Sequence, residues 1–428
     1  MLLRDALVAT LDPPRVERAD LRIDGERIAE RGPSLRPAAG EEVLDAAGQL
    51  VLPGLVNAHT HLYSALARGM PPSTPPPRSF AEVLERVWWR LDRALDPESV
   101  RLSALVGAME AARSGSTVLF DHHSSPSSIH GSLEAVRGAV EEVGLRSVLC
   151  YEATDRNGRD SFDAALSENR AFLAAGHGGL TRALMGAHAS FTLSDAGLDA
   201  LARAIRECRS SIHIHVAEDR VDVDDCRARC GVGLVERLRR HELLGPGAVL
   251  AHGVHLTEAE LLEAQAAGAW IAHNPRSNMN NHVGHAPTRA LRRAALGTDG
   301  LDQDMLAEAR AAFLAMRASG RDDAVMATVE MLAGGLRLAA ELFGLAFGAL
   351  APGAPADLVL LDYRPPTPMS SETLPGHLLF GLDRSHVRST LVAGRFVLRD
   401  RRITTADEAA VLARAREAGA RLWERMAR

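Results

Sequence analysis

Two histidines stand two positions apart near the start of the chain, at His59 and His61. The apolar run just before them, residues 52–56, predicts a β-strand. Side chains two positions apart on a strand point to the same face, so we expect both imidazoles to project together. One metal ion can bind both rings. The alternative is a pair of packed or hydrogen-bonded histidines.

Further histidines and acids stand at or just beyond the ends of later apolar runs. They are His188, His215 with Glu218, His252 and Asp299. In a barrel of parallel strands, residues at the carboxyl ends of the strands converge on one face. Imidazoles with one carboxylate suit zinc or iron, and a coordination position left for water makes such a site catalytic. The recurrence favours a metal centre over chance packing.

Strand-like runs alternate with helical patterns through the middle of the chain, which is typical of parallel β/α units. The expected strands are 52–56, 116–120, 146–151, 183–186, 211–216, 248–251, 270–272 and 294–296. Helices are expected at 100–113, 133–143, 198–208 and 258–265, then at 304–317, 323–345 and 407–426. Eight strands are what a closed barrel requires.

Both ends of the chain carry short alternating runs broken by Pro and Gly, which predict a small sheet domain. These runs are 7–10, 19–23, 27–29 and 42–44, and then 357–361, 387–392 and 395–398. We therefore expect an α/β fold, a (β/α)8 TIM-like barrel with a small β-sandwich-like domain formed from both chain termini. The expected boundaries are 1–51 and 346–404 for the small domain, 52–345 for the barrel and 405–428 for a C-terminal helix.

Composition limits the classes of partner. The 428 residues are 46% hydrophobic and 24% charged, as in an ordinary globular protein with a large core. A net charge of −6 and no basic stretch argue against a nucleic-acid partner. Four cysteines are too few for a disulfide scaffold. Without a signal-peptide core or a run of roughly 18 apolar residues, we expect a cytoplasmic protein with no membrane contact.

The motifs carry a resemblance to a known family. With Pro53-Gly54 leading to the two histidines, and with Asp299 after a Gly-Thr pair, the chain resembles the amidohydrolase superfamily over nearly its whole length. The stretches 88–90, 121–123 and 273–281 make it similar to the guanine deaminase and chlorohydrolase-like branch, and within that branch to aminohydrolases of the SsnA type.

The resemblance implies a ligand set and a metal count. One divalent ion, Zn²⁺ with Fe²⁺ as the alternative, would be held by His59, His61, His215 and Asp299. The chain has no lysine, so the carbamylated lysine that bridges two metals in other members of the superfamily cannot form. We therefore expect a single ion. Members of the family are often dimers, so a homodimer is expected.

The same resemblance implies a reaction. A divalent ion lowers the pKa of coordinated water from about 15.7 towards 7, which makes hydroxide available at neutral pH. Glu218 would protonate a ring nitrogen, His252 would orient the attacking oxygen, and Asp299 would accept the water proton. The expected activity is deamination of a small nitrogen heterocycle, purine-related. The alternatives are ring opening of a cyclic amide by the same site and a non-catalytic metal-binding barrel.

Substrate contacts are expected from five residues, which are His188, Ser64, Arg156, His122 and Asn274. Ser64 stands three residues after His61, where purine deaminases of this branch often carry a glutamine, which argues against guanine itself as the substrate. His213 shares a strand face with His215, but only His215 matches the family's ligand position, so His213 is expected to be structural.

Overall fold

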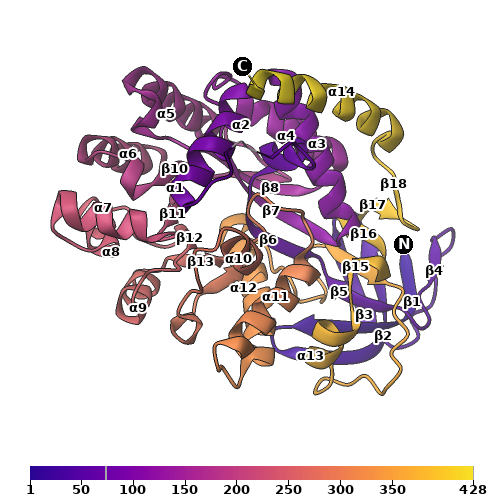
Figure 1. Cartoon of the computed structure of the whole chain (residues 1–428). Helices are drawn as coiled ribbons and strands as arrows, with labels where there is room; N and C mark the ends of the chain where they lie inside the picture. The colour runs from indigo at the N-terminus through magenta and orange to yellow at the C-terminus, as the bar shows by residue number, and fades with distance from the viewer. Residues whose placement is uncertain (73–74, 428) are drawn as a thin grey trace.

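The computed structural model describes residues 1–72 and 75–427 and shows an α/β protein with two parallel sheets in the middle of the chain (Figure 1). One sheet contains β6 (Leu55–Thr60), β7 (Ser116–His123), β8 (Arg146–Tyr151) and β9 (Thr181–Ala183). The other contains β10 (Met185–Ala189), β11 (Ile212–Val216), β12 (Val249–His252), β13 (Trp270–His273) and β14 (Ala294–Leu296). Seven of the eight predicted central strands are present, the fourth divided at Leu184 into β9 and β10, and the predicted first strand is also divided.

Backbone contacts join the two parallel sheets at both of their edges. Thr60, at the end of β6, forms a parallel bridge with Asp299 beyond β14. Ala153, beyond β8, forms a second parallel bridge with Ala187 on β10. The amides of Thr298 and Asp299 both donate to the carbonyl of His59 at 3.0 Å. The strand ends that carry His59 and Asp299 are therefore held together by the backbone.

A third sheet is built from both ends of the chain and has the strand order β18-β17-β16-β15-β5-β1-β2-β3, with β4 paired to β1. Its strands are β1 (Leu2–Leu11), β2 (Pro14–Asp24), β3 (Arg27–Gly32), β4 (Val43–Asp45), β5 (Leu50–Pro53), β15 (Leu358–Leu361), β16 (Val387–Val392), β17 (Arg395–Arg399) and β18 (Arg402–Ile403). The strands predicted at both ends of the chain are confirmed, and β18 is additional.

The prediction of one strand over residues 52–56 is wrong. The chain leaves the terminal sheet at the end of β5 and enters the parallel sheet at the start of β6, with Gly54 between them. A Cβ at Gly54 would lie 2.1 Å from Cγ2 of Thr117 on β7. Only glycine allows the backbone to pass so close to the neighbouring strand.

Helices surround the strands. The longer ones are α3 (Pro97–Arg113), α4 (Ser132–Val143), α5 (Arg159–Ala174), α6 (Asp195–Cys208), α7 (Arg220–Cys230), α11 (Met305–Ala318), α12 (Ala324–Phe343) and α14 (Glu408–Ala427). The shorter ones are α1 (Phe80–Val83), α2 (Trp89–Ala94), α8 (Leu234–Arg240), α9 (Glu258–Ala266), α10 (Pro275–Asn280) and α13 (Leu374–Gly376). The start of α3 shows why a helix forms there, because the Asp96 side chain accepts from the amide of Ser99 and Pro97 occupies the first turn.

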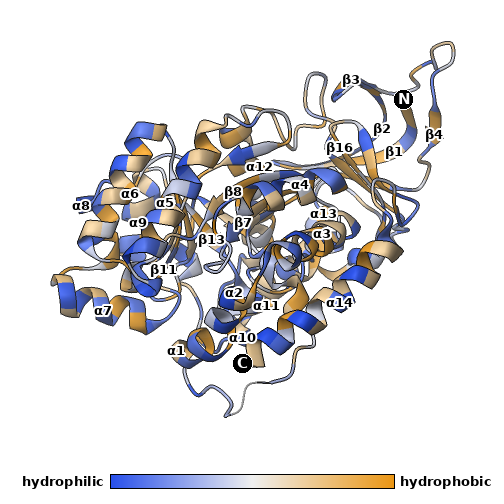
Figure 2. Cartoon of the chain, turned by 90° about the horizontal axis from the view of Figure 1, so that it is seen from above, coloured by the Kyte–Doolittle hydropathy of each residue, from blue (hydrophilic) through white to orange (hydrophobic). Residues whose placement is uncertain are grey.

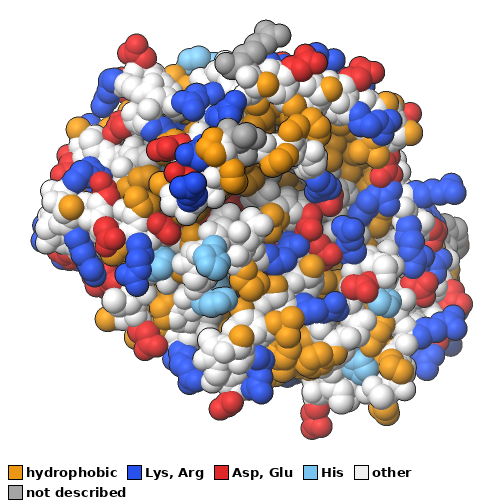
Figure 3. Space-filling view, in the orientation of Figure 1, with side chains coloured by type: hydrophobic (Ala, Val, Ile, Leu, Met, Phe, Trp, Pro, Cys, Tyr) orange, Lys and Arg blue, Asp and Glu red, His pale blue; other side chains and the backbone are white. Residues whose placement is uncertain are grey.

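The helices pack through amphipathic faces. In α14 the buried residues Val411, Ala415, Ala418 and Leu422 recur every three or four positions, so apolar and polar residues alternate along the helix in Figure 2. On the face seen in Figure 3, Arg and acidic side chains are interspersed rather than separated by sign. Within the described residues, no helix is both long enough and apolar enough to span a bilayer.

Candidate metal centre and active site

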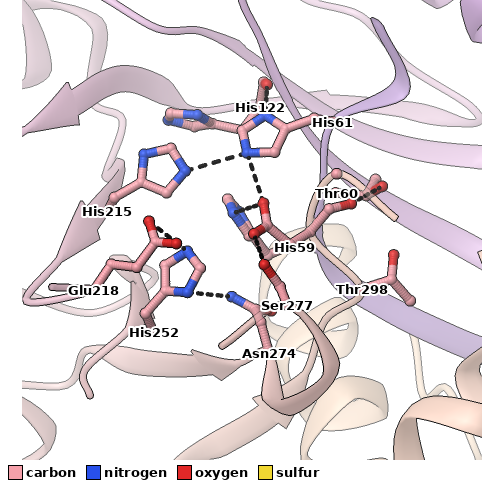
Figure 4. Close-up of polar contacts among 12 residues, drawn as sticks. His59, Thr60, His61, His122, His215, Glu218, His252, Asn274, Ser277 and Thr298 are labelled. Carbon is pink, nitrogen blue, oxygen red and sulfur yellow. Dashed lines mark hydrogen bonds and ion pairs between the residues drawn. The ribbon is translucent and has the colours of Figure 1, made fainter. Parts of the chain in front are cut away.

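Four side chains from three strand ends converge on one point (Figure 4). Nε2 of His61 lies 3.0 Å from Oδ1 of Asp299 and 3.2 Å from Nε2 of His215. Nε2 of His59 lies 3.6 Å from the same Asp299 oxygen. Tetrahedral ligands at zinc distances of 2.0–2.2 Å would stand roughly 3.3 Å apart. The spacing of these four side chains is therefore that of ligands to one ion.

The donor set fits a divalent cation. Nε2 of His59 is buried and has no hydrogen-bond partner among the described residues. Burial opposes protonation of His61, but its hydrogen bond to Asp299 and the charge of that carboxylate outweigh burial and raise the pKa of His61 to about 9. The ligand atoms of His59, His215, His252 and Asp299 lie within 4.8 Å of one another, as do those of His61, His122 and His215. The cluster is built to hold positive charge.

In His59, His61 and His215, the ring nitrogen Nδ1 points away from the convergence point, and its hydrogen bond fixes the orientation of the ring. Nδ1 of His61 donates to the carbonyl of His122 at 2.6 Å, and Nδ1 of His215 donates to the carbonyl of His188 at 2.9 Å. A carbonyl can only accept, so in the neutral rings the proton stands on Nδ1 and Nε2 is free as a ligand. Nδ1 of His59 lies 2.9 Å from Nε2 of His213. His213 thus supports a ligand-facing ring rather than facing the ion itself.

The backbone is strained where these side chains leave their strands. Ala217, His252 and Asp299 have φ of 50°, 79° and 57°, in the left-handed region that non-glycine residues rarely adopt. A Cβ at Gly297 would lie 2.8 Å from both the amide nitrogen and the carbonyl oxygen of His59. Such strain persists only where the surrounding structure enforces it and tends to gather at functional sites.

Glu218 and Asp299 are two buried carboxyl groups whose pKa values shift in opposite directions. Burial and the negative charge of Asp299 raise the pKa of Glu218 well above its ordinary value. Burial also acts to raise the pKa of Asp299, but the neighbouring imidazoles of His59 and His61 overcome it and hold that pKa well below its usual range. Ser277 donates a further hydrogen bond to Asp299. The surroundings therefore favour the protonated form of one carboxyl group and the ionised form of the other, which is the division that acid–base catalysis needs.

His252 lies beside the acid. Its Nε2 is 3.5 Å from Oε2 of Glu218, and its Nδ1 lies 2.9 Å from Oδ1 of Asn278. Because an amide oxygen accepts, Nδ1 carries the proton and Nε2 presents a lone pair. Burial lowers the pKa of His252, so the ring is neutral. A neutral acceptor next to the ligand cluster can accept a hydrogen bond from an attacking water molecule.

A cavity opens beside these side chains. Its floor is formed by His61, His215, Glu218 and Asp299. Its walls include the apolar side chains of Phe80, Leu84, Trp88, Trp89, Phe191 and Val221. An apolar pocket with convergent polar groups is typical of a small-molecule site.

The structure brings one of the five predicted substrate contacts, His188, to the cavity wall. Of the other four, Ser64, His122 and Asn274 are buried and Arg156 is half-buried, and none is among the residues that line the cavity. Ser64 donates to the carbonyl of His61 at 2.7 Å, and Nδ2 of Asn274 lies 3.4 Å from Nδ1 of His252. Nε2 of His122 lies 3.1 Å from two backbone carbonyls, and Arg156 forms an ion pair with Asp92. Ser64 and Arg156 thus contact residues that line the cavity, whereas Asn274 and Nε2 of His122 contact residues outside the lining.

The sequence analysis did not predict four acids that line the cavity, Asp92, Glu152, Asp219 and Asp222. Glu152 directly follows β8, so it carries the strand-end signal that singled out His188. Asp92 lies in α2, before the second strand of the parallel sheet, where no pattern marks it.

Buried imidazoles and a carboxylate that can hold one ion, with a proton-bearing acid beside them at the ends of parallel strands, define a metal-dependent hydrolase. The amidohydrolase family matches residues 50–397, and the chain belongs to this family. The predicted enzyme class and superfamily are thereby confirmed. The finer likeness to SsnA-type aminohydrolases stays a prediction.

Curated relatives match along nearly the whole chain. The 5'-deoxyadenosine deaminase of Methanothermobacter thermautotrophicus is 30% identical over 423 residues, which cover 96% of both chains. The 5-methylthioadenosine/S-adenosylhomocysteine deaminase of Desulforudis audaxviator is 31% identical over 421 residues, which cover 95% of both chains.

Solved structures share the fold at lower identity. An adenosine deaminase from Xanthomonas campestris with bound zinc superposes with a TM-score of 0.86 at 23% identity, covering 98% of both chains. The atrazine chlorohydrolase of Arthrobacter aurescens, complexed with zinc, gives a TM-score of 0.83 at 22% identity, covering 98% of this chain and 99% of that chain.

Proposed function

We propose that this protein is a metal-dependent aminohydrolase, a deaminase that releases ammonia from an aminated carbon of a small purine-related heterocycle. The observation that carries the proposal is the position of Glu218 and Asp299 on one cavity, together with the imidazoles of His61 and His215. The deaminase names of the two full-length relatives support it.

His59, His61, His215 and Asp299 would hold one divalent ion, Zn²⁺ or alternatively Fe²⁺. When bound, the ion would supply Lewis acidity and bring the pKa of coordinated water towards neutrality. The zinc named in the two structural neighbours supports Zn²⁺. Because the chain has no lysine to carbamylate, one ion is proposed rather than two.

The chain's own residues supply the proton steps. His252 accepts a hydrogen bond from the attacking water and orients it, and Asp299 takes up its proton. Glu218 gives its proton to the ring nitrogen next to the attacked carbon. The proton held by Asp299 passes to the amino group, which leaves as ammonia, and the hydroxyl proton of the intermediate returns to Glu218 as the carbonyl forms. Water and an aminated C=N unit thus become a lactam and ammonia, and every proton is accounted for.

We also propose that the two parallel sheets form one (β/α)8 barrel, with a small β domain formed from both termini. If β9 and β10 are counted as one strand, eight strands remain, and bridges join the sheets at both edges. The domain boundaries at 51, 345 and 404 belong to this proposal. The homodimer and the cytoplasmic location stay predictions.

The test is an ammonia assay. Zinc-loaded protein is mixed with a panel of aminated and oxidised purines, pterins, triazines and 5'-deoxyadenosine-type nucleosides, and ammonia and substrate are both measured. We expect equal amounts of ammonia released and substrate consumed. Consumption without ammonia would instead support ring opening of a cyclic amide. No consumption of any compound would support a non-catalytic metal-binding barrel.

A further inference from the structure

We propose that Glu152 helps to determine the substrate specificity of the site. Its carboxylate accepts hydrogen bonds from N–H groups on the heterocycle and selects rings that carry such donors, as a lactam N–H or a second amino group, over rings that lack them. This inference rests on the proposed deaminase function and narrows its substrate class.

Glu152 is placed to touch a substrate. It follows β8 at the carboxyl end of the strand, where its amide donates to the carbonyl of His123 at 2.8 Å. The residue is only 3% exposed, yet it lines the cavity. The carboxylate is therefore removed from bulk solvent and faces the space that a substrate would fill.

The carboxylate lacks close partners in the protein. Its nearest nitrogen atoms are Nε2 of His188 at 3.3 Å, Nδ1 of His122 at 3.6 Å and Nη2 of Arg156 at 3.8 Å. All three distances exceed the 2.7–2.9 Å of a charge-assisted hydrogen bond. A buried carboxylate without close donors is costly unless a ligand or water completes it.

The two neighbouring imidazoles do not supply the missing donors. The Thr192 hydroxyl donates to the carbonyl of Ala189 at 3.1 Å, so it must accept from Nδ1 of His188 at 2.7 Å. In His122, Nε2 lies 3.1 Å from two carbonyls and carries the proton. A neutral imidazole has one donor and one acceptor nitrogen. The two imidazole nitrogens that face Glu152 are thus acceptors, which leaves the carboxylate free to accept hydrogen bonds from a ligand.

Glu152 lies close to the reacting centre. Only one imidazole separates it from the ligand cluster, since the rings of His188 and His215 are 5.5 Å apart. A heterocycle whose aminated carbon sits at the ligands would therefore place its own ring edge, rather than a distant substituent, against Glu152.

The surrounding charges leave this part of the cavity negative. Arg156 pairs with Asp92 and lies over the ring of Trp89, 4.9 Å from its centroid. One buried cation thus faces two carboxylates, those of Asp92 and Glu152. A net negative wall favours N–H donors and disfavours phosphorylated or otherwise anionic substrates.

The test compares Glu152→Gln with the wild type on matched substrate pairs. Each pair is an aminated purine with a ring N–H or second amino group, such as 2-oxoadenine or 2,6-diaminopurine, and its N-methylated derivative. We expect the wild type to prefer the donor-bearing member by roughly 10- to 150-fold in kcat/KM, the value of one hydrogen bond to a charged group. Glu152→Gln should remove this preference and leave the methylated member unaffected.

Two controls separate selectivity from damage. Glu258→Gln, an exposed residue in the first turn of α9, should change neither member of a pair. Metal content and thermal unfolding should show that Glu152→Gln is folded and loaded. An equal loss on both members of every pair, or a wild-type preference that follows ribose hydroxyls instead of ring N–H groups, would overturn the assignment of Glu152.

A binding assay distinguishes this inference from the proposed function. Calorimetric titration of the same pairs into zinc-loaded Glu218→Gln, and into the double variant with Glu152→Gln, requires no turnover. Ammonia release without donor discrimination in either assay refutes the role of Glu152 and leaves the deaminase function standing. Donor-selective binding that Glu152→Gln abolishes, with no ammonia released by the wild type, refutes deamination and supports the role of Glu152.

Discussion

The metal-facing cluster, formed by the proposed ligands His59, His61, His215 and Asp299 with His252 beside them, is buried, and so is the Arg146–Asp357 pair. The two differ in how many of their polar atoms have hydrogen-bond partners. Nε and Nη2 of Arg146 lie 2.7 and 3.1 Å from the two carboxylate oxygens of Asp357. The amide of Ala393 donates to the same carboxylate at 2.9 Å. The pair joins the start of β8 to the residue just before β15 and so links a parallel sheet to the terminal sheet.

In the metal-facing cluster the partners are incomplete. Nε2 of His59 and Nε2 of His252 are buried without hydrogen bonds in the described part of the chain. The backbone at His252 and Asp299 is strained, whereas no residue of the Arg146–Asp357 pair has a positive φ. A buried charge with complete partners stabilises the fold, and a buried polar cluster left incomplete is reserved for a ligand.

The largest expected effect comes from the acid of the incomplete cluster. Replacing Glu218 by Gln keeps the shape of the side chain but removes its transferable proton, so kcat should fall by roughly 10²–10⁴-fold. Metal content and thermal stability should be unchanged, because Glu218 lies outside the proposed ligand set. Steady-state ammonia assays check this, and a variant with wild-type kcat would refute the role of Glu218.

The complete pair should affect stability instead of chemistry. Asp357→Ala leaves the Arg146 cation buried without a partner and should lower the free energy of unfolding by about 3–5 kcal/mol. Activity per folded molecule should stay at the wild-type level, because neither residue lines the cavity. Denaturant unfolding measures the loss. The double variant Arg146→Met/Asp357→Leu removes both charges and should recover much of the lost free energy of unfolding. If it does not, the pair stabilises the fold by more than the mutual neutralisation of its two charges.

A smaller effect, on zinc affinity, is expected from the contact between His213 and Nδ1 of His59. His213→Phe keeps the ring volume but removes the nitrogen that contacts Nδ1 of His59. Loss of such an orienting contact should weaken zinc binding by roughly 10- to 100-fold. Competition with a chelator measures this affinity. The matched control His241→Phe, at a surface ring paired with Asp199, should bind zinc as the wild type does.

The pH dependence gives the finest distinction between the two carboxyl groups. Because the pKa of Glu218 is raised, its protonated, active form persists at neutral pH and is lost as the pH rises through that pKa. The kcat of the wild type should therefore fall on the alkaline side. In Glu218→Gln, whose residual rate depends on no such proton, this alkaline limb should be absent, and an unchanged limb would assign it to another group.

The sequence predicts the convergence of the proposed ligand residues better than it predicts which residues line the cavity, for a physical reason. His59, His61, His215 and Asp299 stand at strand ends, and the period of a strand and the direction of parallel strands decide where such side chains point. Ser64 and Asn274 face backbone and imidazole partners instead of the cavity. Those partners come from distant parts of the chain, so only the tertiary structure decides between them.

The same contrast applies to the fold. The strands were predicted at nearly their observed places because apolar runs flanked by polar residues are a local signal. The break at Gly54 was not predicted, because it depends on the approach of Thr117, more than sixty positions away in the chain. Glu152 had the strand-end signal but lacked a motif, and its role depends on His122 and His188, which come from other strands.

The most direct test of a single ion held by four convergent side chains is a metal count on purified protein, wild type and Asp299→Ala, by elemental analysis alongside the ammonia assay. The account predicts one zinc or iron ion per wild-type chain, and a folded Asp299→Ala variant that has lost both the ion and the activity. Two ions per wild-type chain, or an Asp299→Ala variant that keeps its ion and its turnover, would contradict it.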